Sequence, residues 1–215
     1  MTKQKVLLHN IFLYLSMFTL WSLWQIYAKP IALPGVSWGA WVNAFVKGVI
    51  WTTPMFLLWK REGWLVQPSK AFFSPLPWLP CLGMLCAALC FLYTVRIAAG
   101  RQNTVLIWEH IFLLFSISAG VIEEIAFRGL LFNRLASKTG IFPAAMMNGL
   151  MFAIFHYPRL MIGQGWEQLA SPRFLMLFCV GGLFSLAFAR WKNLWLLIIV
   201  HTFWNILSYL FTLTG

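Results

Sequence analysis

The stretch Gly120-Val-Ile-Glu-Glu-Ile-Ala-Phe-Arg-Gly129 places Glu123, Glu124 and Arg128 in a region that is otherwise apolar enough to be buried in a membrane. The chain has only five acidic residues, so two adjacent glutamates are conspicuous. On insertion scales each ionisable side chain at a bilayer centre costs about 2.5–3.5 kcal/mol. Three unpaired ones would cost about 8–10 kcal/mol. Ionisable groups retained at such a cost indicate a functional site.

The surrounding sequence is that of a membrane protein. Of its 215 residues, 61% are hydrophobic, 18% are aromatic and 10% are charged, whereas a soluble domain carries about 25% charged residues. We predict an all-α, polytopic transmembrane bundle in which residues 1–215 form one domain and the motif-bearing helices lie within about 113–212. Apolar runs near the roughly 20 residues that cross a bilayer predict about seven spans: 7–28, 38–59, 78–98, 113–135, 141–157, 173–190 and 194–212.

The net charge is +11, from 16 basic against 5 acidic residues. In a soluble protein this excess would suggest nucleic-acid binding, but here the basic residues mostly lie between apolar runs, where they contact lipid headgroups. We therefore expect the lipid bilayer, and no nucleic acid, as the partner of these charges. With seven spans, nine Lys and Arg residues fall on the side of the N-terminus and five on the other. We expect a multi-pass protein of the cell (inner) membrane, and the positive-inside rule places its N-terminus in the cytoplasm.

Three further features have ordinary structural interpretations. Lys47 falls inside the second predicted span, where snorkelling or a partner carbonyl is more usual than a functional role. Gly120 is a candidate break in the fourth span. The four cysteines lack the His or carboxylate neighbours of a zinc set, so we expect small thiols that fill space in the core; they are Cys81, Cys86, Cys90 and Cys179.

The spacing within the opening stretch divides its charges between two roles. In a helix Glu124 and Arg128 are four residues apart, share a face and can form an ion pair that offsets much of their burial cost. Glu123 is turned about 100° away and keeps a free carboxylate. The pattern therefore favours a structural role for Glu124 and a chemical role for Glu123. The alternative is a purely structural triad that holds helices together.

Two later spans each carry a polar motif. The fifth contains Phe152-Ala-Ile-Phe-His156, in which Phe152 lies one turn from His156 and can pack against its ring. The seventh contains His201-Thr-Phe-Trp-Asn205, whose imidazole and amide project from one helix face. Each motif alone is also typical of a buried histidine or of interhelical hydrogen bonding.

The predicted depths bring these groups together. Glu123 lies 17 residues before the turn near Gly140 and His156 lies 16 residues after it, so both would be about 24–26 Å from the turn if helical. Asn205 would be roughly 16 Å above the start of its span and His201 lower, and helix tilt would have to close the gap. Amide hydrolysis needs a general base that activates water, a histidine that shares the proton, and hydrogen-bond donors to the oxyanion.

The ordered set E-E-x-x-x-R, F-x-x-x-H and H-x-x-x-N on separate helices resembles the CPBP family (CAAX protease and bacteriocin-processing proteins, also called Abi), which includes type II CAAX prenyl endopeptidases. The resemblance covers about the C-terminal half of the chain. It implies an intramembrane endopeptidase of the glutamic type. By this resemblance Glu123 and His156 would activate water, and His201 and Asn205 would form the oxyanion hole. The residues that would support the site are Glu124, Arg128 and Phe152.

The resemblance also implies a substrate and raises the question of a metal. The expected substrate is a peptide or protein with a membrane-embedded or C-terminal segment. CAAX-cleaving relatives often have an eighth helix, and only seven spans are predicted here, which puts a prenylated substrate in doubt. The Glu and His residues could hold zinc, but H-E-x-x-H is absent and no cysteine is near, so we expect no cofactor and no metal.

Other functions remain open for the same residues. A peptide-binding or bacteriocin-immunity membrane protein could use the polar cluster for recognition without cleavage. A zinc-dependent version of the same protease is a second alternative. Glu and His residues within spans also serve proton-coupled carriers, although no inverted repeat supports that function here.

Overall fold

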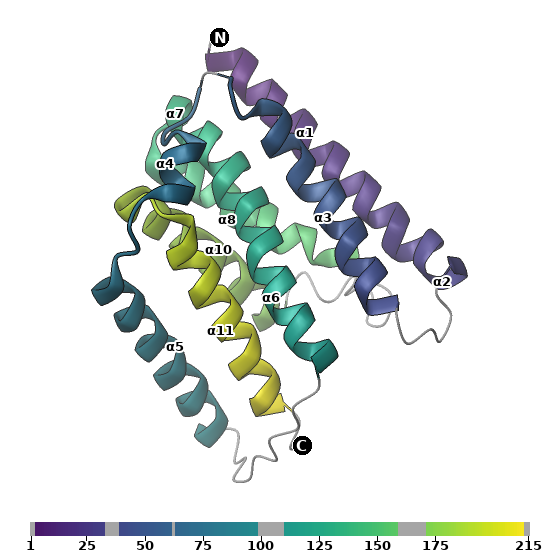
Figure 1. The fold of residues 1–215 in the computed structure, drawn as a ribbon, viewed down its shortest axis with the longest axis vertical. Helices are drawn as coiled ribbons and strands as arrows, with labels where there is room; N and C mark the ends of the chain where they lie inside the picture. The colour runs from purple at the N-terminus through teal and green to yellow at the C-terminus, as the bar shows by residue number, and fades with distance from the viewer. Residues whose placement is uncertain (1–2, 33–38, 62, 99–109, 159–170, 213–215) are drawn as a thin grey trace.

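The computed structural model describes residues 3–32, 39–61, 63–98, 110–158 and 171–212, which form a bundle of helices (Figure 1). In chain order the helices are α1 (Lys3–Leu23), η1 (Trp24–Ala28), α2 (Lys29–Ala32), α3 (Gly39–Leu58), α4 (Pro68–Phe73), α5 (Trp78–Ala98), α6 (His110–Glu124), η2 (Ile125–Phe132), α7 (Asn133–Thr139), α8 (Ile141–Phe155), α10 (Pro172–Trp191) and α11 (Leu194–Thr212). The segments η1 and η2 are π-helical. The predicted all-α class is confirmed.

Each of the seven predicted spans lies in a helical stretch; the first runs through α1 and η1, and the fourth through α6, η2 and the start of α7. Within the described residues, three helical segments are long and apolar enough to cross a membrane: Gln4–Ala28, Trp78–Val95 and Pro172–Trp191. Many large apolar side chains lie on the outer surface, among them Leu57 and Leu79, which are 76% and 83% exposed. A surface of this kind fits contact with lipid.

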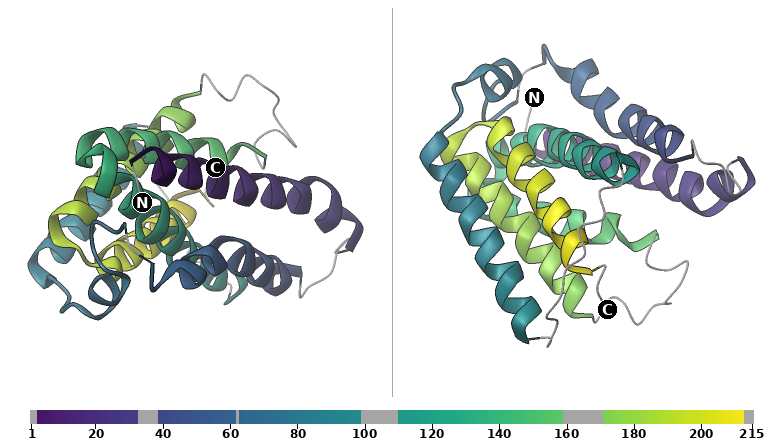
Figure 2. Two further views of the ribbon diagram at one scale, coloured as in Figure 1. Left: turned by 90° about the horizontal axis from the view of Figure 1, so that it is seen from above. Right: turned by 60° about the horizontal axis from the view of Figure 1, so that its bottom comes forward.

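Packing between helices brings the fourth, fifth and seventh predicted spans together. Helix α8 packs along α10, and α11 contacts both α5 and α6. Figure 2 shows α5 beside α11, with α1 and α3 on the other side of α6. Helix α3 contacts α6 and η2, and α1 contacts α3 and α7. The segment from α6 to η2 is therefore enclosed by α3, α8 and α11.

A cluster of aromatic rings fixes α3 against the centre of the bundle. The buried Trp51 ring of α3 makes edge-on contacts with Trp21, Phe127 and Phe155, with centroid separations of 5.4, 5.7 and 4.4 Å. Edge-to-face pairs at these separations add to the stabilisation from apolar burial. Because these rings come from α1, η2 and α8, the cluster sets the position of α3 relative to the helices that carry the polar motifs.

The chain remains helical through Gly120, so the expected break at this glycine is wrong. A Cβ atom here would lie 3.1 Å from both the carbonyl oxygen of Ile198 and the backbone nitrogen of Thr202. The glycine therefore allows the backbones of α6 and α11 to approach closely, as small residues do between membrane helices.

The expectation that all cysteines fill the core holds only for Cys81, which is buried. Cys86, Cys90 and Cys179 are exposed. Cys86 and Cys90 lie on α5, which contacts α11 along one side, and their side chains are on an outward face. Thiols are apolar enough to lie on a surface in contact with lipid.

The π-helical segment η2 directly follows the two glutamates, and all of its residues are buried. Side-chain amides donate to three of its carbonyl oxygens: Asn148 to Phe127 at 3.0 Å, Asn133 to Gly129 at 3.2 Å and Asn10 to Leu131 at 3.4 Å. π-Helical turns are rare and often occur at functional sites. These direct hydrogen bonds link η2 to α1, α7 and α8.

Candidate active site

Glu123 lies in the last turn of α6, with its side chain 7% exposed. Its Oε1 atom is 2.5 Å from Nζ of Lys47 on α3. The expectation that Lys47 snorkels or contacts a carbonyl is therefore wrong, and so is the expectation of an entirely free Glu123 carboxylate. A lysine enclosed in an apolar bundle requires an anionic partner. Helix α3 places Lys47 within reach of Glu123.

The second carboxylate oxygen of Glu123 faces two imidazoles. Oε2 lies 3.8 Å from Nε2 of His156 and 3.7 Å from Nε2 of His201. Both separations exceed hydrogen-bond length, and within the described part of the chain Oε2 has no hydrogen-bond partner. A buried acceptor without a partner calls for an explanation, and a water or substrate atom held between the three groups would satisfy it.

His156 immediately follows the last residue of α8 and is held by that helix end. Its Nδ1 lies 2.8 Å from the carbonyl oxygen of Phe152, one of the carbonyls that a helix C-terminus leaves unpaired. Because a carbonyl only accepts, Nδ1 carries the hydrogen, and Nε2 of the neutral ring is an acceptor directed toward Glu123. The predicted packing of Phe152 on His156 is present, with ring centroids 4.7 Å apart.

Glu124 is fully buried and binds two partners through one oxygen. Its Oε1 accepts from Nη1 of Arg128 at 2.9 Å, which is the ion pair predicted from the spacing. The same oxygen lies 2.7 Å from Nδ1 of His201. Since a carboxylate only accepts, Nδ1 of His201 carries a hydrogen. The Nε2 atom of His201 therefore accepts in the neutral ring and donates in the imidazolium.

Arg128 connects this network to α10. Its Nη2 donates to the carbonyl oxygen of Gly181 at 3.0 Å. Its guanidinium lies 4.7 Å from the ring centroid of Phe152 and 5.3 Å from that of Phe184. Cation–π contacts of this kind stabilise a charge that has been removed from water.

A cavity of about 60 Å³ opens beside the two imidazoles, which is more than one water molecule requires. His156, His201 and Asn205 line it, so the structure brings Asn205 to the same space as both histidines. The other lining residues are Phe152, Met176, Leu177, Val180, Phe184 and Trp204. The wall of this largely apolar cavity thus offers two imidazoles and an amide, and the carboxylate of Glu123 lies within 3.8 Å of both imidazoles.

The fit of a metal can be judged from the donor set. The described residues contain no group of three or more His, Cys, Asp or Glu side chains that could hold a metal ion. Glu123, His156 and His201 come nearest to one, and Lys47 already occupies Oε1 of Glu123. Its positive charge would oppose a second cation at the same carboxylate. Zinc therefore fits this cluster poorly.

Sequence reasoning missed Lys47 as a member of this cluster. Its depth within a predicted span was a usable signal, since ionisable residues at such depth usually face a polar partner inside the bundle. The identity of that partner could not be read from the sequence, because Lys47 and Glu123 are 76 residues apart.

Two comparisons with known proteins find relatives of this chain. The family model described as "Type II CAAX prenyl endopeptidase Rce1-like" matches residues 105–207, which include all three motifs. A Bacillus subtilis (strain 168) protein named "Putative membrane peptidase YdiL" is 28% identical over 120 residues, which are 53% of this chain and 44% of that protein. No solved structure matches the chain. By its ordered motifs and this family match, residues 105–207 of the chain are similar to the type II CAAX prenyl endopeptidase family.

Proposed function

We propose that this protein is an intramembrane endopeptidase in which Glu123 activates water. The observation that carries the proposal is the unpaired Oε2 of Glu123, which lies within 3.8 Å of Nε2 of His156 and of His201 beside a cavity. Similarity to a family of prenyl endopeptidases, and to a protein named as a membrane peptidase, supports the same reaction class. That likeness covers less than half of the relative's length.

The proposed reaction begins with a water molecule between Oε2 of Glu123 and Nε2 of His156. Both atoms are acceptors, so each can take one hydrogen bond from the water. Glu123 removes a proton as the water oxygen bonds to the carbonyl carbon of the substrate. The same proton then passes to the amide nitrogen as the carbon–nitrogen bond breaks, which leaves a new carboxyl group and a free amine. His156 orients the water and shares the proton.

The negative charge that develops on the substrate oxygen requires hydrogen-bond donors in the cavity wall. The amide of Asn205 can donate from α11, and His201 can donate from Nε2 when it is the imidazolium, because Glu124 holds its Nδ1 hydrogen. Donors preorganised in a site with little water stabilise an oxyanion strongly, and the loss of one typically costs about 10²–10³-fold in kcat.

The proposed substrate is a membrane-associated peptide or protein, including one that carries a C-terminal signal. The cavity wall supports this class, because its residues from α10 and α11 are mostly apolar (Met176, Leu177, Val180, Phe184 and Trp204). An apolar segment that lies in the bilayer could occupy this wall without leaving a hydrophobic environment.

The test is a comparison of the peptides in membrane and exported fractions from cells with native protein and from cells with Glu123→Gln. Gln keeps the size of Glu123 and removes the base. We expect new peptide termini in native cells that are absent from the variant, although the variant is inserted and folded. Identical termini in both strains would refute the proposal. Protection against a bacteriocin that persists in Glu123→Gln would instead indicate recognition without cleavage.

A chelator separates the proposed mechanism from a zinc-dependent one. We expect cleavage by the purified protein to persist in excess chelator, because the proposed steps use side chains and water but no metal ion. Activity that is lost with chelator and restored by zinc would contradict the metal-independent mechanism.

A further inference from the structure

Lys47 lies next to Glu123 but does not line the cavity itself. Its Nζ atom lies 2.5 Å from Oε1 of Glu123, 4.5 Å from the ring centroid of Trp51 and 5.9 Å from that of Trp21. The side chain is 13% exposed. A carboxylate on one side and indole rings on the other leave the ammonium few alternative positions.

Apolar packing sets the backbone position of Lys47 independently of its ion pair with Glu123. Trp51 follows it by one helical turn, is 2% exposed and packs against Phe127 and Phe155. This aromatic contact holds α3 against η2 and α8. The backbone of Lys47 is thus set by apolar packing, and the side chain is directed at Glu123 from a fixed support.

We propose that Lys47 is a positioning residue for Glu123 in the hydrolytic site, an inference that rests on the proposed function. Its ammonium keeps Glu123 as a carboxylate in an apolar environment and occupies Oε1, so that Oε2 alone is presented to water. A carboxylate without this cation would be buried with no counter-charge at Oε1, which strongly disfavours the ionised form. The other charged or titratable groups near the pair are Glu124, Arg128, His156 and His201.

This role predicts a particular change in the kinetics. Because Lys47 is outside the cavity wall, its loss should lower kcat and leave KM nearly unchanged. General-base catalysis is worth about 10²–10⁴-fold, so a weakened base in Lys47→Met should cost kcat roughly 10- to 100-fold. Lys47→Arg, which retains the positive charge, should keep most of the native kcat. The matched control is Lys70→Met, which removes an exposed lysine on α4 and should be as active as the native protein.

The experiment measures kcat and KM in proteoliposomes with a substrate identified by the peptide comparison, together with thermal unfolding. Lys47→Met should unfold at a lower temperature than the native protein. Lys47→Met combined with Glu123→Gln should recover stability and remain inactive, because neither charge is then left alone. A native kcat in Lys47→Met, or equal loss of kcat in the Met and Arg variants, would overturn the inference.

Two further arms keep the test decisive. If Lys47→Met does not fold, Lys47→Gln retains a hydrogen-bond donor without the charge, and it should also lose kcat at least roughly tenfold; a native kcat there would overturn the inference. Cleavage by Glu123→Gln would remove the proposed function itself. An inactive Glu123→Gln with a fully active Lys47→Met would leave the proposed function in place and reject only the role of Lys47.

Discussion

Arg128 is the residue on which the internal order of the site most depends. Its guanidinium is fully buried, pairs with Glu124 and binds the backbone of α10 at Gly181. A lysine could not replace it, because an ammonium lacks the planar fork that reaches two acceptors in fixed directions. Without Arg128, the buried Glu124 would keep only its contact with His201.

We predict that Arg128→Met lowers the free energy of unfolding by about 3–5 kcal/mol, because it leaves a buried carboxylate without its counter-charge. Thermal unfolding of the purified protein in detergent measures the effect. Glu124→Gln combined with Arg128→Met should recover part of the loss, since the Gln side chain still accepts from His201 and carries no charge. An Arg128→Met variant as stable as the native protein would contradict this account. So would a double variant that is no more stable than Arg128→Met alone.

The contacts that could be predicted from the sequence at this scale are local ones. The Glu124–Arg128 pair and the packing of Phe152 on His156 both follow from residues four apart on one helix. The contacts of Glu123 with Lys47 and of Glu124 with His201 join residues 76 and 77 positions apart. Helical periodicity specifies which face a side chain occupies, but it does not specify which face of another helix lies opposite.

At the scale of elements, η2 is the feature that sequence reasoning did not predict. An apolar run indicates a buried helix, but the same run is compatible with an α-helix or a π-helix. The π-helical form is stabilised by side-chain amides of other helices: Asn10 of α1 and Asn148 of α8 donate to carbonyl oxygens of η2. Ser185 of α10 in turn donates to Oδ1 of Asn148 at 2.9 Å. Tertiary hydrogen bonds therefore stabilise a backbone conformation that local propensity does not reveal.

The crossing of α8 and α10 gives a prediction at the same scale. A Cβ atom on Gly149 would lie 2.6 Å from the carbonyl oxygen of Phe178 and 3.0 Å from the backbone nitrogen of Gly182. Neither backbone atom can move aside alone, so Gly149→Ala must separate the helices that hold His156 and Gly181. We predict a lower unfolding temperature and lower activity, measured by thermal unfolding and by peptide cleavage.

The matched control is Gly83→Ala, also within a helix, where nothing lies within 4 Å of the added carbon. Alanine is favoured over glycine in a helix by about 0.8–1.0 kcal/mol, so this variant should be as stable as the native protein or slightly more stable. If Gly149→Ala matched Gly83→Ala in both measurements, close approach of the two helices would not be required.

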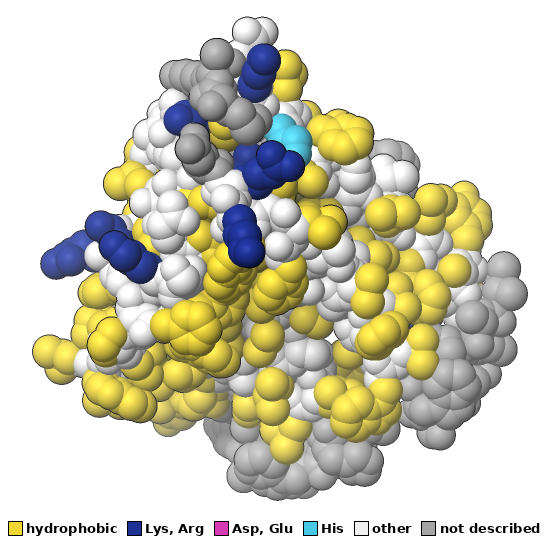
Figure 3. All heavy atoms as spheres, turned by 45° about the horizontal axis from the view of Figure 1, so that its top comes forward, with side chains coloured by type: hydrophobic (Ala, Val, Ile, Leu, Met, Phe, Trp, Pro, Cys, Tyr) yellow, Lys and Arg dark blue, Asp and Glu magenta, His cyan; other side chains and the backbone are white. Residues whose placement is uncertain are grey.

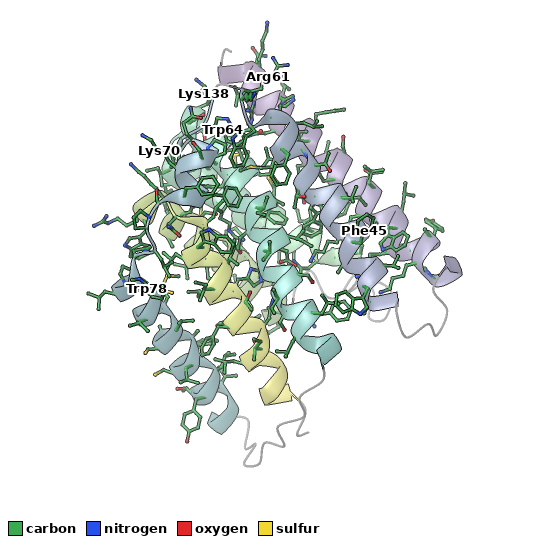
Figure 4. The ribbon with its side chains drawn as sticks, viewed as in Figure 1. Phe45, Arg61, Trp64, Lys70, Trp78 and Lys138 are labelled. Carbon is green, nitrogen blue, oxygen red and sulfur yellow. The ribbon has the colours of Figure 1, made fainter. Side chains whose placement is uncertain are left out.

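For the whole molecule, the charge distribution bears on orientation in the membrane. Basic residues gather at the end that holds the N-terminus, where Figure 4 labels Arg61, Lys70 and Lys138. Figure 3, which looks toward that end, shows Lys and Arg side chains above an apolar surface. The positive-inside rule then favours a cytoplasmic location for this end. The charge count predicts this orientation, whereas the packing of the helices required the three-dimensional structure.

We predict that a single cysteine at Lys70 or Lys138 reacts with an impermeant maleimide only from the cytoplasmic side of the membrane. The background should lack the four native cysteines, three of which are exposed. A cysteine at Lys29, which charge counting places on the opposite side, should react only from outside. The measurement compares labelling of intact cells with that of inverted membrane vesicles, and the reverse pattern would overturn the proposed orientation.

The most direct test of the central claim is a single-turnover cleavage in water labelled with oxygen-18, with a substrate identified from the peptide comparison. If Glu123 acts as a base on water, the new carboxyl group of the first product carries oxygen-18, and Glu123→Gln yields no product. Unlabelled oxygen in the first product would show transfer from the protein itself. That result, or cleavage by Glu123→Gln at the native rate, would contradict water activation by Glu123.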